Sequence, residues 1–157
     1  SSDVCSSDLR GINKMTIEDF VTHEINEYQT DNVREIIDYH DISIEYNDQL
    51  NKACDSSIFL FHQTAYITIK SDLNPLYENF LLAHELGHYL MHYDENISFQ
   101  FLLKTRKNSL EREANEFACR FLLHDIDLKE IENIDFIIKE RGIPIKIWRS
   151  VCEYIII

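Results

Sequence analysis

The stretch that most constrains this chain is residues 74–92, where an apolar segment carries two histidines four positions apart. Asn74 and Pro75 predict a helix start, because asparagine caps a first turn and proline is favoured at the first helical position. On a helix, His84 and His88 project from the same face, one turn apart. Their imidazoles are therefore candidates to bind one metal ion together.

Glu85 follows the first histidine directly, which completes the pattern His-Glu-x-x-His. In zinc metalloproteases with this pattern, the metal polarises the scissile carbonyl and acidifies a water, while the glutamate takes that water's proton. Glu85 is therefore the candidate general base, and His84 and His88 are candidate metal ligands. A short pattern also arises by chance on a polar helix rim, so the interpretation requires a third ligand elsewhere.

Two candidates for the third ligand lie just after the motif. Asp94 falls where the metzincin pattern has its last ligand, but Met91 stands in place of the glycine that permits the turn. His92 lies one turn further along the helix, and three histidines on successive turns are too widely spaced to close one tetrahedron. We therefore expect His92 to be an outer group of the site or a surface residue.

A second helix, predicted from Asn108 to Leu123, offers two glutamates. At about 100° per residue its apolar positions define a buried face, and Glu111 lies at the edge of that face. The predicted buried face is Leu110, Ala114, Phe117, Ala118 and Phe121, and the predicted wetter side is Glu113, Glu116 and Arg120. Glu111 is the expected third ligand, with Asn115 placed to orient a ligand by hydrogen bonding. Glu113 and Asp94 remain the alternatives.

The other patterns predict an α+β domain, mostly helical, with a small sheet of about three strands, antiparallel or mixed, before the motif helix. Helices are expected over residues 17–28 and 32–39, from Asp127 to about Gly142, and from Pro144 onward. Strands are expected over residues 42–46, 58–61 and 65–69. Tyr66–Lys70 is the candidate edge strand beside the metal, where an extended substrate backbone would pair.

Composition limits the class of protein. A chain of 157 residues that is 45% hydrophobic suits one domain. Residues 1–10 repeat Ser-Ser-Asp and are expected to be a non-native leader, which leaves 11–157 as the single domain. The net charge of -13 opposes direct nucleic-acid binding and favours a basic polypeptide partner. We expect no membrane association and a cytoplasmic location, because the apolar runs are too short to span a bilayer.

The paired motifs carry a family resemblance. The run His84-Glu85-Leu86-Gly87-His88-Tyr89-Leu90-Met91-His92, followed by Glu111 to Ala118 and Leu122-Leu123, resembles the ImmA/IrrE family of metallopeptidases. The resemblance covers residues 58–123 and implies a zincin-like fold with a gluzincin-like Zn²⁺ site. It places His84, His88 and Glu111 in ligand positions and Glu85 in the catalytic position. It also implies a cytoplasmic protease, often encoded on phages or mobile elements, that cleaves a helix-turn-helix repressor.

The sequence thus predicts a zinc-dependent endopeptidase of narrow specificity whose substrate is a helix-turn-helix repressor. The alternative is a zinc-bound regulatory or antitoxin-like module that sequesters a repressor without cutting it. An intact Glu85 favours the enzyme, because a binding module has no need of a base. Tyr66, Tyr89 and Tyr93 are the candidates for stabilising the tetrahedral intermediate.

Overall fold

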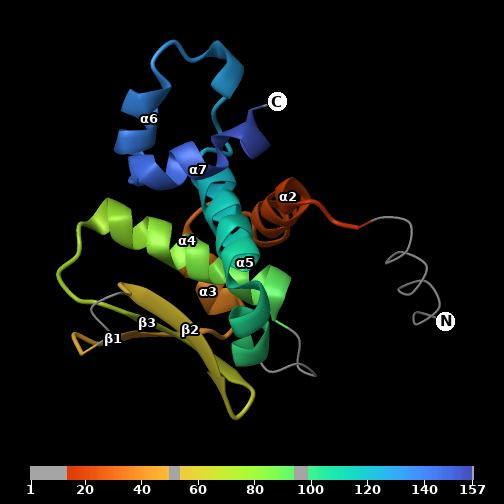
Figure 1. Ribbon diagram of the computed structural model, residues 1–157, viewed down its shortest axis with the longest axis vertical. Coiled ribbons are helices and arrows are strands. Elements are labelled where there is room, and N and C mark those ends of the chain that lie inside the picture. Colours follow the sequence, from red (N-terminus) through yellow and green to blue (C-terminus); the bar gives the residue numbers. More distant parts are fainter. Residues whose placement is uncertain (1–13, 50–53, 94–98, 157) are drawn as a thin grey trace.

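The computed structural model describes residues 14–49, 54–93 and 99–156, and for residues 99–107 the backbone alone. The leader predicted at residues 1–10 and the alternative ligand Asp94 therefore lie outside the described residues. The elements, in chain order, are α2 (Ile17–Tyr28), α3 (Val33–Tyr39), β1 (Ser43–Tyr46), β2 (Ser56–Phe61), β3 (Thr64–Ile69), α4 (Pro75–His92), α5 (Phe99–Leu122), η1 (Leu128–Glu130), α6 (Ile134–Glu140) and α7 (Ile145–Ile155) (Figure 1).

Two helix starts follow directly from local sequence. At α2, the Asp19 amide donates to Thr16 Oγ1 at 3.1 Å and the Thr16 amide donates to Asp19 Oδ2 at 2.9 Å, a complete capping box. At α4, the Leu76 amide donates to Asn74 Oδ1 at 2.9 Å, and Pro75 is the first helical residue. The predicted start of the motif helix is therefore confirmed.

The sheet is mixed and three-stranded, and it precedes α4 as predicted. Its order is β1-β3-β2, with β3 parallel to β1 and antiparallel to β2. The expectation that Tyr66–Lys70 forms an edge strand is wrong, because β3 lies in the centre of the sheet. Local patterns favour the β2–β3 hairpin, but they carry no information on which side of the hairpin β1 pairs. Among the described strands, the edges are β1 and β2.

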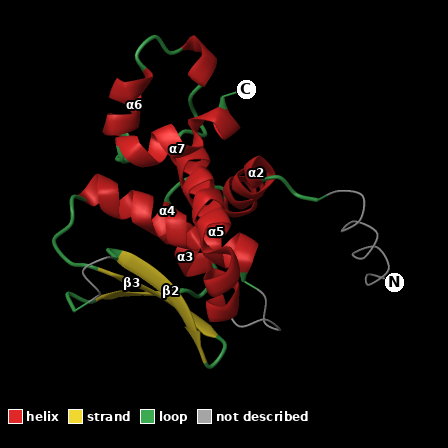
Figure 2. Ribbon diagram, viewed as in Figure 1, coloured by secondary structure: helices red, strands yellow, loops and turns green. Residues whose placement is uncertain are grey.

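The helices gather on one side of this sheet (Figure 2). α4 packs on β2 and β3 and, more extensively, against α5. The core between them includes the fully buried Phe80, Leu82 and Leu86 of α4 with Ile67 and Ile69 of β3. None of the described helices is long and apolar enough to cross a membrane.

Gly87 explains how closely α4 and α5 approach each other. A Cβ atom at this position would lie 3.0 Å from Phe117 Cδ1 and 3.1 Å from Phe117 Cβ, tighter than ordinary van der Waals contact. Glycine in a helix interior destabilises by about 1 kcal/mol relative to alanine. Close contact with α5 is thus the physical reason for a glycine in the motif.

Two predicted helices have different bounds in the structure. α5 begins at Phe99, nine residues before the expected cap Asn108, so the helix is longer at its N-terminal end than predicted. The helix expected from Asp127 to about Gly142 is divided into the 3₁₀ turn η1 and α6. The division arises because each piece has its own cap: Asp127 accepts from the Lys129 amide, and Asn133 accepts from the Phe136 amide.

The end of α6 and the last helix agree with the sequence. Gly142 follows the C-cap residue Arg141 and has a φ of 77°, in the left-handed region, and the Ile143 amide donates to the Ile138 carbonyl at 3.1 Å. α7 then begins after Pro144 and buries Trp148 and Val151. The C-terminal segment covers the end of α5, on the side away from the sheet (Figure 1).

Candidate metal centre

Three of the predicted site residues come from one buried face of α4. His84 is 8% exposed, Glu85 4% and His88 3%. Glu111 reaches them from α5: its Oε2 lies 3.2 Å from His84 Nε2, and its Oε1 lies 2.9 Å from His88 Nε2. One ligand atom from each of His84, His88 and Glu111 lies within 4.8 Å of the other two. The structure therefore brings together the two histidines and the glutamate that helical phase selected.

This donor set fits a metal ion. Two imidazole nitrogens and one carboxylate oxygen are the protein ligands typical of a catalytic zinc site, which keeps a fourth position open. With metal–ligand distances of about 2.0–2.2 Å, tetrahedral ligand atoms lie roughly 3.3 Å from one another. Each Glu111 oxygen lies at about that distance from one histidine nitrogen, Oε2 at 3.2 Å from His84 Nε2 and Oε1 at 2.9 Å from His88 Nε2. Within the described part of the chain, His84, His88 and Glu111 are the group of side chains so arranged. They form a metal site.

Electrostatics couple the members of this group. Burial alone would raise the pKa of Glu111, but hydrogen bonds with His84 and His88 outweigh it and hold that pKa well below its usual range. Burial alone would lower the pKa of His84, but the hydrogen bond with Glu111 and the charge of Glu85 outweigh it and raise that pKa. Asn115, which the sequence predicted to orient a ligand, adds a smaller contribution in the same direction. A metal ion and a protonated His84 would therefore compete for the carboxylate of Glu111.

Glu85 is held by a residue that the sequence analysis missed. The Ser56 hydroxyl, at the start of β2, donates to Glu85 Oε1 at 2.8 Å, and both side chains are buried. No motif surrounds Ser56, because the contact depends on how β2 lies against α4. The hydrogen bond fixes one carboxylate oxygen of the candidate base.

His92 lies outside the group of three but touches it. It is 7% exposed, its Nδ1 lies 2.9 Å from His88 Nδ1, and its Nε2 lies 2.8 Å from Glu113 Oε2. The expectation of an outer group is therefore confirmed, and the surface alternative is wrong. Glu113 contacts His92 instead of facing only solvent, because α4 covers this part of α5.

The prediction for Glu116 is wrong. It was placed on the wetter side of its helix, yet it is 6% exposed. Its Oε1 lies 3.2 Å from Arg112 Nη1, and its Oε2 lies 2.9 Å from Arg120 Nε. These arginines stand one turn before and one turn after Glu116 on the same helix, and their guanidinium groups neutralise it where α7 and α2 pack against α5.

The three candidate tyrosines contact other aromatic rings. Tyr66 stacks with Phe59 at a centroid distance of 5.4 Å, and Tyr89 stacks with Tyr93 at the same distance. Their role in stabilising a tetrahedral intermediate stays a prediction.

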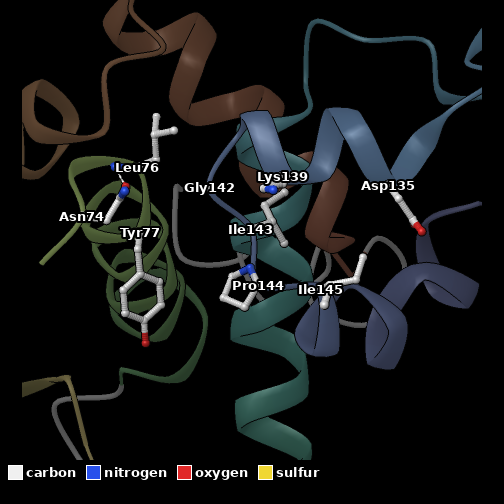
Figure 3. A pocket seen from close by; sticks show the side chains of 9 residues that line it. All are labelled: Asn74, Leu76, Tyr77, Asp135, Lys139, Gly142, Ile143, Pro144 and Ile145. Carbon is white, nitrogen blue, oxygen red and sulfur yellow. Dashed lines mark hydrogen bonds between the residues drawn. The ribbon is translucent and has the colours of Figure 1, made fainter.

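A separate pocket of about 660 Å³ lies at the other end of α4. Asn74, Leu76 and Tyr77 line it from one side, and the segment around Ile143 and Pro144 lines it from the other (Figure 3). His84 follows Leu76 by eight residues, about 12 Å along the helix axis. The pocket contains none of the predicted site residues, so the metal centre is distinct from it.

Comparison with known proteins identifies the family. A family model described as the IrrE N-terminal-like domain matches residues 37–141. The chain is 31% identical over 129 residues to immunity region protein 2 of Bacillus phage phi105, covering 76% of this chain and 78% of the relative. It is 35% identical over 116 residues to metallopeptidase ImmA of Bacillus subtilis (strain 168), covering 68% of this chain and 62% of the relative. No solved structure matches.

The matched region contains both helices that build the metal centre, and it confirms the resemblance seen in their motifs. The chain belongs to the IrrE N-terminal-like family of metallopeptidases.

Proposed function

We propose that this protein is a zinc-dependent endopeptidase of narrow specificity that cleaves a helix-turn-helix transcriptional repressor of a phage or mobile element in the cytoplasm. The observation that carries the proposal is the convergence of His84, His88 and Glu111, with the carboxylate of Glu85 buried on the same helix. A binding module would need the three ligands, but it would not need a fixed carboxylate next to them.

Each residue has one role in this proposal. His84, His88 and Glu111 would hold the ion, and a bound Zn²⁺ would polarise the scissile carbonyl and acidify a water. Glu85 would take the proton of the attacking water and deliver it to the leaving amine. Ser56 would keep Glu85 in place through its hydrogen bond to Oε1, which leaves Oε2 to face the water.

The strand β2 is the proposed place for an extended substrate. It is an edge strand among the described strands, and its first residue, Ser56, touches the candidate base. A substrate segment could therefore add to this edge by backbone hydrogen bonds and bring a peptide bond to Glu85. Phe59, Leu60 and Phe61 at the far end of β2 are 45%, 40% and 59% exposed, so apolar side chains of a substrate would find contacts there.

A repressor substrate is supported by family membership, by one relative and by charge. The phage relative is an immunity region protein, which agrees with an action on a regulator of that region. A net charge of -13 attracts a basic partner, and a DNA-binding protein presents a basic surface. Narrow specificity follows if charge attraction and β2 pairing are both required.

The test uses purified full-length chain, without a metal-binding tag and with Zn²⁺ restored, incubated with the repressor encoded beside its gene. Fragments are identified by intact mass. We expect one cleavage position, loss of cleavage with a chelator, and no cleavage by Glu85→Gln that still contains zinc. Sequestration without cutting would instead give a stable complex that forms equally well with wild type and Glu85→Gln, and that result would contradict the endopeptidase.

A further inference from the structure

A series of hydrogen-bonded side chains leads from the metal centre to the side of α5. It consists of His88, His92 and Glu113, and it is made by two contacts: 2.9 Å between the Nδ1 atoms of the two histidines, and 2.8 Å between His92 Nε2 and Glu113 Oε2. Both histidine side chains are 3% exposed, and that of Glu113 is 30% exposed. Water therefore has little access to the two imidazoles, and their ring nitrogens must be satisfied by each other and by protein.

The proton positions that these contacts require show which histidine tautomers the series favours. To offer Nε2 to a metal, a neutral His88 must carry its proton on Nδ1. His92 Nδ1 lies 2.9 Å away and is placed to accept that proton, so it must then present a lone pair. The proton of His92 is accordingly on Nε2, where the acceptor-only carboxylate of Glu113 receives it.

The opposite arrangement is unfavourable. If His92 carried its proton on Nδ1 and donated it to His88, the lone pair of His92 Nε2 would face the oxygens of Glu113 at 2.8 Å. Two acceptors at that separation repel each other, and a buried acceptor left without a donor is destabilising. Glu113 therefore selects one tautomer of His92, and His92 in turn selects the metal-binding tautomer of His88.

We propose that His92 and Glu113 are positioning residues that fix the orientation and tautomer of His88 for metal binding. The inference rests on the proposed function of His84, His88 and Glu111 as the metal site, and it assigns to two further residues a share of the metal affinity. His92 does not act as a ligand itself, because its Nδ1 is directed at His88 and its Nε2 at Glu113. The polar partners behind a metal-binding histidine commonly raise metal affinity 10–100-fold.

Helical spacing is what makes this series of contacts possible. His84, His88 and His92 stand at intervals of four, so the third imidazole lies one turn beyond the second and meets its outer nitrogen. Glu111 and Glu113 stand two apart on α5, where side chains diverge, so one reaches the inner face of His88 and the other reaches His92. The contact with His88 and the contact with His92 are therefore made by different glutamates.

The first measurement is the dissociation constant for Zn²⁺, obtained by competition with a chromophoric chelator on the tag-free full-length chain. We expect Glu113→Ala and His92→Ala each to weaken binding about 10–100-fold, and Glu113→Gln, which keeps one acceptor oxygen, to weaken it less. Glu78→Gln is the matched control. It removes a half-buried carboxylate of α4 that is paired with Arg34, and we expect its affinity to equal that of wild type.

The second measurement reads the tautomers directly, by two-bond proton–nitrogen correlation spectra of zinc-loaded protein labelled with ¹⁵N-histidine. The His92→Ala spectrum assigns the His92 signals. We expect His88 protonated on Nδ1 and His92 on Nε2 in wild type, and a mixture of His92 tautomers in Glu113→Ala. Circular dichroism of each variant checks that it is folded.

The outcomes separate this inference from the proposed function. If wild type binds zinc but Glu113→Ala binds it equally tightly, the positioning role is wrong while the metal site stands. A wild-type His92 protonated on Nδ1, or coordinated to zinc, overturns the inference in the same way. A wild type that binds no zinc contradicts the proposed function itself.

Discussion

Two glutamates of α5 interact with cationic or potentially cationic groups in different ways, and the difference separates a site from a structural ion pair. The Glu116 side chain is 8% exposed and is held by Arg112 and Arg120 of its own helix. The Glu111 side chain is 40% exposed and is held by His84 and His88 of another helix. Guanidinium groups remain protonated, whereas imidazoles can lose their protons and offer lone pairs. We call Glu111 with His84 and His88 the Glu111 group, and Glu116 with Arg112 and Arg120 the Glu116 group. Of the two, only the Glu111 group can therefore exchange protons for a metal ion.

The largest expected effect is on the cleavage rate, and it lies at the candidate base Glu85, next to the Glu111 group. Glu85→Gln keeps the shape of the side chain and the Ser56 contact but removes the proton acceptor. We expect repressor cleavage to slow about 100- to 10,000-fold, the usual contribution of a general base, with zinc content unchanged. The rate is measured by quantifying the fragments over time. A variant that still cuts within threefold of wild type would remove Glu85 from the mechanism.

The next effect tests the comparison itself. Glu111→Gln should weaken zinc binding at least about 100-fold, because losing a ligand must exceed the loss of an outer partner. Glu116→Gln should leave zinc binding unchanged. Chelator competition on the two variants side by side gives the answer. Equal losses in both would mean that the two clusters are not functionally distinct.

Stability should show the reverse order. Glu116→Gln leaves two arginines with a weaker partner, and we expect the free energy of unfolding of metal-free protein to fall by about 1–2 kcal/mol. Glu111→Gln should change it less, because water reaches Glu111. Urea unfolding of both variants in the presence of a chelator measures the difference. A larger loss in Glu111→Gln would show that the metal site also serves as the main structural ion pair.

The pH dependence follows from the shifted pKa values in the Glu111 group. The pKa of His84 is raised above its ordinary 6.5, so its stabilising effect is full below pH 6.5 and is lost as the pH rises through the higher folded pKa. The pKa of Glu111 is lowered from 4.5, so its effect is present above pH 4.5 and is lost only in stronger acid. Metal-free protein should therefore lose stability as the pH rises above 6.5.

Zinc affinity should change in the opposite direction, because protons on His84 compete with the metal. Urea unfolding with a chelator, and zinc competition without one, are measured over the same pH series. In Glu111→Gln the stability decline above pH 6.5 should become smaller, because only Glu85 and Asn115 still raise the pKa of His84, whereas Glu116→Gln should keep the full decline. A decline of the same size in both variants would assign it to other histidines.

Both clusters also show what the sequence could and could not predict. The ligands His84, His88 and Glu111 follow from helical spacing and phase, which are local properties. Glu116 was misplaced because phase relative to one apolar face does not reveal which further helices cover the opposite side. Ser56 was missed because its contact with Glu85 joins a strand to a helix 29 residues away.

The fold shows the same limit. Helix starts at Thr16 and Asn74 were predictable because the capping side chain and its amide lie within three residues. The central position of β3 was not predictable, because it depends on the parallel partner β1, about twenty residues earlier. Local chemistry thus determines where elements begin, while pairing between distant segments determines which strand becomes an edge.

The smallest predicted effect concerns Gly87, which should matter for the Glu111 group and not for the Glu116 group. An added methyl group would press on Phe117, whose side chain is fully buried, so α4 and α5 must separate slightly. Overpacking of about 1–3 kcal/mol, offset by about 1 kcal/mol of helix propensity, gives an expected net loss near 1 kcal/mol for Gly87→Ala. Because the Glu111 contacts span the two helices, zinc binding should weaken as well. The arginine pairs of Glu116 lie within one helix and should be unaffected.

A double-mutant cycle with Phe117→Leu measures the coupling by urea unfolding, since the smaller side chain relieves the contact. Strict additivity would show that contact with Phe117 is not the reason for the glycine.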